Sequence, residues 1–152
     1  MKYYLSKSSD GLVPVDPESQ AWFNRLKTGQ VISADFRQVR NYRFLKKWFA
    51  LLKIGFDNWE PGEVDSKYGT PEKNFDRFRA DVTILAGYFD TTIRLDGSVR
   101  VEPKSVSFAK MTEEEFGELY SKTIDVLIKY VYGSGMTPEQ MDKTVEQYLQ
   151  FA

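Results

Sequence analysis

The chain has 152 residues, of which 28% are charged and 41% are hydrophobic, and its formal net charge is −1. With 15% aromatic residues, this length and composition predict one folded domain, residues 1–152, with a sizeable core. The absence of Cys and His excludes disulfide bonds, a thiolate nucleophile, a histidine general base and the commonest zinc ligand. We therefore expect no catalysis, no metal and no cofactor.

The N-terminal segment MKYYLSKSSDG lacks the apolar core of a signal peptide. No apolar run in the chain approaches the roughly 18 residues that span a bilayer. These features predict a cytoplasmic protein without a membrane partner.

The N-terminal part of the chain predicts two short extended segments and a helix. Residues 2–6 (KYYLS) favour β-structure, and residues 10–16 (DGLVPVD) predict a turn followed by an extended segment. Asp16 is typical of an N-cap, with Pro17 at the first helical position, so a helix is expected through residues 18–27.

Residues 30–39 alternate well enough to predict a strand, which leads into the basic and aromatic residues 40–59. In that stretch apolar side chains recur at helical spacing, at positions 42, 45, 49, 52 and 56. A second stripe follows the positions of Arg43, Lys46, Ala50 and Lys53, and we call it the basic ridge. The stretch therefore predicts a helix with one apolar face and one basic face.

The rest of the chain predicts a loop, a hairpin and three helices. Residues 60–73 have no period and predict a mobile loop. Asp96-Gly97 is a strong hairpin signal between strands near 88–95 and 99–102. Helices are expected from residue 74 to about Gly87, after a capping box at Thr112 and Glu115, and after Thr137-Pro138. The fold class is thus α+β: a small antiparallel sheet with four to five packed helices.

Charge is distributed unevenly along the chain. Between Gln20 and Lys53 eight basic residues accompany the single acid Asp35, whereas from Met111 onward eight acids accompany three lysines. An exposed helix face usually mixes both signs, but no acid lies between Asp35 and Asp57. We therefore favour a polyanion site at the basic ridge over its alternative, an ordinary solvated helix face.

The predicted DNA-binding residues surround this ridge. Phosphates would be neutralised by Arg37, Arg40, Arg43, Lys46, Lys47 and Lys53, while Asn41 would donate a hydrogen bond to the DNA backbone. Tyr42 and Trp48 are retained as aromatic platforms on which a base could stack, and the other aromatics of the helix are assigned to packing.

A metal-dependent nuclease is a weaker interpretation. Glu102-x-Lys104, preceded by Asp90 or Asp96, resembles the Asp…Glu-x-Lys arrangement of restriction-type nucleases. A chain with this many charges contains such triplets by chance, and Pro103 cannot donate to a strand ladder. We therefore expect a polar strand end at this position.

Three stretches, RNYRFLKKWFALL (40–52), ILAGYFD (84–90) and SVSFAKMTEEEFGELY (105–120), resemble a phage-encoded family of unknown function. Members often carry a His where this chain has Leu45, so a role of that His does not transfer. More distantly, the same blocks resemble the NinB (Orf) family of phage recombination mediators. The matching positions are Arg40, Lys46, Lys47, Phe49, Ala50, Leu52, Ser107, Met111, Glu115, Phe116, Glu118 and Leu119.

The second resemblance implies a homodimer that binds single-stranded DNA without sequence preference and helps to load a recombinase. We therefore predict a phage-type, non-enzymatic recombination mediator in the cytoplasm of a bacterial host, with a host recombinase or single-strand-binding protein as a further partner. The alternative is a phage protein that binds and inhibits a host factor through its acidic C-terminal helices.

Overall fold

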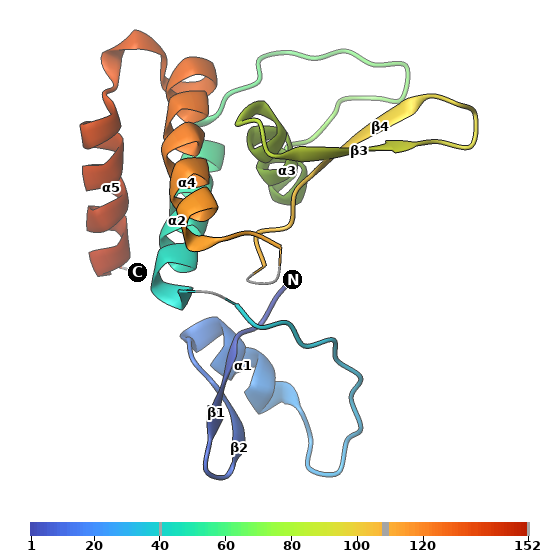
Figure 1. Ribbon diagram of the computed structural model, residues 1–152, viewed down its shortest axis with the longest axis vertical. Helices are drawn as coiled ribbons and strands as arrows, with labels where there is room; N and C mark the ends of the chain where they lie inside the picture. The colour runs from blue at the N-terminus through green and yellow to red at the C-terminus, as the bar shows by residue number, and fades with distance from the viewer. Residues whose placement is uncertain (40, 108–109, 152) are drawn as a thin grey trace. The chain divides into compact units, whose positions relative to one another are not determined.

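The computed structural model describes residues 1–39, 41–107 and 110–151 (Figure 1). These residues contain five α-helices and two antiparallel sheets of two strands each, so the predicted α+β class is confirmed. The small sheet expected from the sequence is present as two separate hairpins. The chain divides into two compact units, Met1–Phe36 and Arg37–Ala152, which are described in turn.

The first unit is a hairpin followed by a helix. Strand β1 (Leu5–Ser8) pairs with β2 (Gly11–Pro14), and helix α1 spans Pro17–Arg25. The N-cap prediction is confirmed, because the Asp16 side chain accepts a hydrogen bond of 2.7 Å from the backbone nitrogen of Ser19. The hydroxyl oxygen of the buried Ser19 in turn accepts a bond of 2.8 Å from the backbone nitrogen of Tyr4. This bond joins the helix to the hairpin.

The prediction of a strand at residues 30–39 is wrong. These residues form no regular secondary structure and all are exposed, Val31 to 95% and Phe36 to 69%. A strand is stable only where a neighbouring strand accepts its backbone hydrogen bonds and its apolar side chains are covered. Neither condition is met here, so the alternation of side chains does not produce a strand.

The second unit is built around helix α2 (Tyr42–Asn58), which lies against α4 (Glu113–Leu127) and α5 (Pro138–Phe151) (Figure 1). Large side chains at this junction are completely buried, among them Leu51 and Leu52 of α2, Phe116 of α4 and Met141 of α5. Gly55 allows close approach, because a Cβ atom at that position would lie 2.7 Å from Leu127 Cδ2. The capping box predicted at Thr112 and Glu115 is confirmed at the start of α4.

Helix α3 (Phe75–Leu85) leads into strand β3 (Phe89–Ile93), which pairs with β4 (Val99–Pro103). The predicted hairpin is confirmed: Gly97 has a φ of 85°, and the Asp96 side chain accepts a 2.9 Å hydrogen bond from the Ser98 backbone nitrogen. After α4 the chain continues through a π-helical turn, Ile128–Tyr132, and a short 3₁₀ turn, Gly133–Gly135, into α5.

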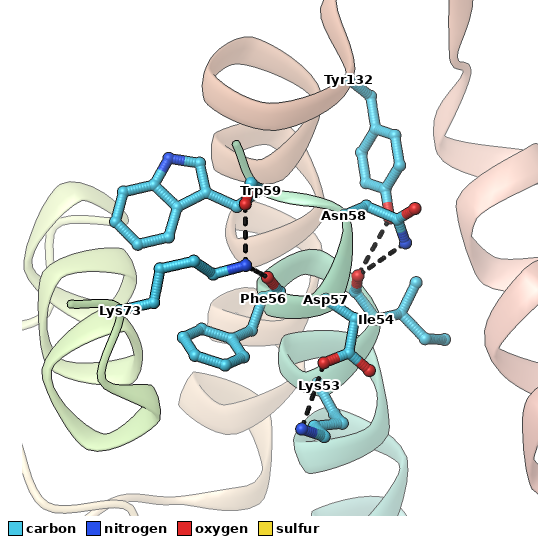
Figure 2. A network of polar contacts seen from close by, with 8 residues as sticks. All are labelled: Lys53, Ile54, Phe56, Asp57, Asn58, Trp59, Lys73 and Tyr132. Atoms are coloured by element: carbon cyan, nitrogen blue, oxygen red, sulfur yellow. Dashed lines mark hydrogen bonds and ion pairs between the residues drawn. The ribbon is translucent and has the colours of Figure 1, made fainter. Parts of the chain in front are cut away.

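Residues 60–73 form the exposed loop expected from the sequence. Its last residue, Lys73, reaches back to the end of α2, where its Nζ donates to the backbone oxygens of Phe56 at 2.6 Å and Trp59 at 2.8 Å (Figure 2). A cation at a helix C-terminus satisfies carbonyl groups that have no partner within the helix. Within the described part of the chain, no helix is both long and apolar enough to cross a membrane.

Candidate nucleic-acid interface

A groove of about 530 Å³ lies where the N-terminal end of α2 faces the C-terminal half of α5. We call it the α2 groove and define it by the polar residues Asn41, Arg43, Lys46, Lys47, Glu146 and Gln150, with Phe44 and Leu149 as its apolar lining. Four of the nine residues predicted to contact DNA therefore line one surface depression. Arg43 and Lys46 are exposed, so their charges are available to a ligand.

Asn41 forms the N-cap of α2. Its Oδ1 accepts a hydrogen bond of 3.2 Å from the backbone nitrogen of Phe44, which leaves the side-chain amide nitrogen without a partner among the described residues. The first turn of the helix contains no acidic residue. Because a helix N-terminus carries partial positive charge and unpaired N–H groups, this end of α2 favours an anion.

Lys47 differs from Arg43 and Lys46, the other basic residues of the groove, in its ion pairs with α5. Its Nζ lies 2.9 Å from Asp142 Oδ1 and 2.8 Å from Glu146 Oε1, both on α5. The Tyr120 hydroxyl donates a 2.8 Å hydrogen bond to the same Asp142 oxygen. Burial of Lys47 acts to lower its pKa, but the hydrogen bonds to Glu146 and Asp142 outweigh it, and the pKa is raised.

A phosphate contact of Lys47 stays a prediction, and a phosphate would have to compete with this ion pair. Two carboxylates already compensate its charge, and its side chain is only 21% exposed. Sequence reasoning counted Asp142 and Glu146 only as members of an acidic surface. Their i,i+4 spacing on one face of the last predicted helix was the available signal for a shared cationic partner.

Lys53 does not belong to the groove. It lies near the other end of α2, where its Nζ is 3.1 Å from Asp57 Oδ1 (Figure 2). It lies seven positions after Lys46, which corresponds to about 10 Å along a helix. Between them Ala50 is buried, so the basic ridge is interrupted and only its N-terminal part faces the groove.

Trp48 is a core residue, and its prediction as a stacking platform is wrong. The side chain is completely buried, and its Nε1 donates a 3.0 Å hydrogen bond to Thr123 Oγ1 on α4. Neither ring face is open to a base, because the apolar stripe of α2 is wide enough to include position 48. Tyr42 is partly exposed in the first turn of α2, and its contact with a base stays a prediction.

Two predicted residues precede the helix. Arg37 is exposed in a segment without regular secondary structure, four residues before the N-cap. Arg40 lies outside the described residues.

The residues of the nuclease alternative lie near one another on the hairpin of β3 and β4. Asp90 of β3 is directly opposite Glu102 of β4, and Lys104 Nζ lies 3.9 Å from Asp90 Oδ1. All three side chains are about half exposed or more. Glu102 also has a basic neighbour, because Arg100 Nη1 lies 3.7 Å from Glu102 Oε1. Among the described residues there is no group of three or more acidic, His or Cys side chains that could hold a metal ion.

Comparison with known proteins gives a family but no activity. A family model described as "Protein of unknown function (DUF1367)" matches residues 2–67 and 63–151. No curated protein and no solved structure matches the chain. The family match extends over almost the whole sequence and includes the α2 groove.

Proposed function

The chain belongs to the DUF1367 family of proteins of unknown function, and from this premise we propose that it binds single-stranded DNA, without sequence preference and without catalysis, through the α2 groove. The observation that carries the proposal is the convergence of Arg43, Lys46 and the N-terminal end of α2 on one groove. Cationic side chains and helix N-termini both commonly contact phosphate.

The lining of the groove supports a single strand over a duplex. Phe44 lines it and packs against Phe116, with ring centroids 4.9 Å apart, so its position is held by the core. Unpaired bases can lie against an aromatic ring while the backbone follows the cations, whereas a duplex hides its base faces. Arg37 and the amide nitrogen of Asn41 extend the polar contacts toward the segment before α2.

The finer parts of the proposal follow from the resemblance to the NinB (Orf) family. We propose that the chain acts as a phage-type recombination mediator in the cytoplasm of a bacterial host. It would form a homodimer and have a host recombinase or single-strand-binding protein as partner. The comparisons support the family of unknown function; phage origin and recombination are part of this proposal.

The alternative function, capture of a host factor by the acidic C-terminal helices, has less free surface. Asp142 and Glu146 are engaged by Lys47. Glu115 belongs to the capping box of α4, and Glu118 accepts a 3.2 Å hydrogen bond from the Tyr88 hydroxyl. At least half of the eight acids in this part of the chain thus already have partners among the described residues, which favours the DNA proposal.

Fluorescence polarisation with labelled single-stranded oligonucleotides at several salt concentrations tests the proposal. For single strands the logarithmic salt slope changes by roughly 0.7 for each phosphate neutralised. The double substitution Arg43→Ala/Lys46→Ala should therefore reduce the slope by about one to two units and weaken binding to all sequences alike.

The matched charge reversals are Arg43→Glu/Lys46→Glu in the groove and Lys67→Glu/Lys129→Glu outside it. All four residues are exposed, so both variants should fold like the parent. Only the groove variant should lose DNA binding. Equal binding by both variants, or no binding by the parent, would show that the groove is a solvated helix end. Lys47 is unsuitable here, because its substitution also breaks an ion pair.

A further inference from the structure

The hairpin of β3 and β4 has one entirely uncharged face. Cross-strand partners share a face, so Phe89, Thr91 and Ile93 of β3 lie on the same side as their partners Pro103, Val101 and Val99 of β4. We call these six residues the hairpin face. The opposite side carries Asp90, Thr92, Arg100 and Glu102.

The hairpin face is only partly covered within the described chain: Phe89 is 42% and Val101 44% exposed, and β4 contacts α3. Every residue of β3 and β4 is exposed, with Ile93 at 81% and Val99 at 59%, and Leu95 in the turn is fully exposed. Among the described residues the two strands pair only with each other. A two-stranded hairpin is marginally stable by itself and normally buries its apolar side against another layer.

We propose that the hairpin face is the surface on which a second copy of this chain docks, face to face, to form a two-fold symmetric dimer. In such a dimer the same surface is present on both sides, so any net charge on it would face itself. The hairpin face carries none, whereas the opposite side of the hairpin carries charges of both signs. An uncharged surface also offers no electrostatic attraction to the phosphates of a nucleic acid.

The available area suits a dimer of moderate stability. An aromatic side chain has about 150–250 Å² of surface and an aliphatic one less; Phe89, Ile93, Val99 and Val101 of the hairpin face and Leu95 of the turn are 42–108% exposed. These five side chains leave on the order of 600 Å² per copy, somewhat below the roughly 800 Å² per partner of a standard interface. The dimer should therefore dissociate measurably on dilution in the micromolar range.

This proposal goes beyond the proposed function. It assigns a surface to the homodimer expected there, but it stands on the hairpin alone and needs no DNA. The last helix is a less suitable surface for a second copy, because Met141 and Val145 of α5 are completely buried within the chain.

Sedimentation velocity from about 1 to about 100 μM tests the dimer. The parent should shift from monomer to dimer over this range, and Ile93→Glu should remain monomeric throughout. The matched control is Thr92→Glu, which places the same charge one residue away on the opposite side of the hairpin, beside Arg100. This control should dimerise like the parent, and thermal melting should show both variants folded.

Cysteine cross-linking provides a second measurement that depends on no destabilising change. The chain has no Cys, so Thr91→Cys at the middle of the hairpin face introduces a single thiol. Mild oxidation should link two copies through Thr91→Cys and leave Thr92→Cys unlinked. A parent that is monomeric at every concentration overturns the proposal, as does a dimer that survives Ile93→Glu and is not linked through Thr91→Cys.

The two proposals fail separately. Ile93→Glu should keep the DNA affinity of each chain, measured with an oligonucleotide too short for two copies. A parent that dimerises through the hairpin face but does not bind DNA refutes the proposed function and leaves this inference intact.

Discussion

The contacts of Lys47 in the structure differ from those that its sequence neighbours predict. In the sequence it stands beside Lys46 in a segment without acids, and both residues predict phosphate contacts. In the structure Lys46 is exposed at the groove, while Lys47 joins α2 to α5 through Asp142 and Glu146. One step along a helix rotates a side chain by about 100°, which is enough to exchange solvent for an ion pair.

The ion pair predicts a pH-dependent contribution to stability. The hydrogen bond from Lys47 holds the pKa of Asp142 below its ordinary value of 3.8, although burial opposes this. A lowered carboxyl pKa stabilises the fold above the unfolded value, and this contribution is lost as the pH falls below 3.8 through the folded value. The pKa of Lys47 is raised above 10.5, so its contribution is present below that pH and is lost above it.

Asp142→Asn should therefore destabilise the protein at pH 7 by roughly 1 kcal/mol, a modest value because both side chains remain partly exposed to solvent. Urea unfolding of parent and variant at pH 7 and near pH 3 measures the effect. The difference should shrink at the lower pH, because the stabilisation by the ionised carboxyl declines as the pH falls below 3.8 toward the folded pKa. Asp125→Asn, at an exposed position on α4, is the control, and a difference that does not change with pH contradicts the ion-pair assignment.

At the scale of elements, helix α2 connects the candidate site to the core. Its N-terminal end lines the groove, and in its middle the side chains of Trp48, Leu51 and Leu52 are buried in the core. At its C-terminal end Lys73 donates a hydrogen bond to the backbone oxygen of Phe56. Asn58 Nδ2 and the Tyr132 hydroxyl donate hydrogen bonds to the backbone oxygen of Ile54 (Figure 2). The groove is therefore built on a helix fixed along its length.

The contact of α2 with α4 predicts opposite effects at two glycines. In Gly55→Ala the new Cβ would lie 2.7 Å from Leu127 Cδ2, so the helices must separate or Leu127 must move, at a cost of about 1–3 kcal/mol. Gly117→Ala on α4 meets nothing within 4 Å and should stabilise by about 0.5–1 kcal/mol through helix propensity. Urea unfolding measures both, and equal stabilisation by the two changes would disprove the close contact.

At the scale of the whole molecule, the charge asymmetry of the sequence is partly cancelled in space. Basic α2 lies against acidic α5 in the second unit, and the pairs of Lys47 with Asp142 and Glu146 connect them. On α2, what remains for an external anion at the groove is local, namely Arg43 and Lys46 at one end of the helix. Binding should thus involve few phosphates and depend on salt only moderately.

The expectation that the protein has no nuclease activity is also tested on the whole protein. Asp90, Glu102 and Lys104 meet on the charged side of the hairpin but are open to solvent. Because a catalytic carboxylate pair needs a site that holds a metal and excludes bulk water, we expect single- and double-stranded DNA to remain intact with Mg²⁺ or Mn²⁺. Gel assays of parent and Glu102→Ala measure this, and metal-dependent cleavage lost in the variant would establish a nuclease.

Local signals in the sequence were sufficient for most elements. Asp16-Pro17, the capping box at Thr112 and Glu115, and Asp96-Gly97 determine helix starts and a turn through contacts within a few residues, and all three predictions are confirmed. The helical period of residues 42–56 likewise predicted α2. Such features depend only on neighbours along the chain.

Tertiary structure decided the features that depend on distant residues. The alternation at residues 30–39 had no strand to pair with, Trp48 was covered by α4, and Lys47 met acids about one hundred positions away. The composition and order of residues determined an α+β chain with a basic helix. Which of its cations reach solvent, and how far its hairpin stays exposed, followed only from the packing of the elements and from strand pairing, because burial is a property of contacts between elements.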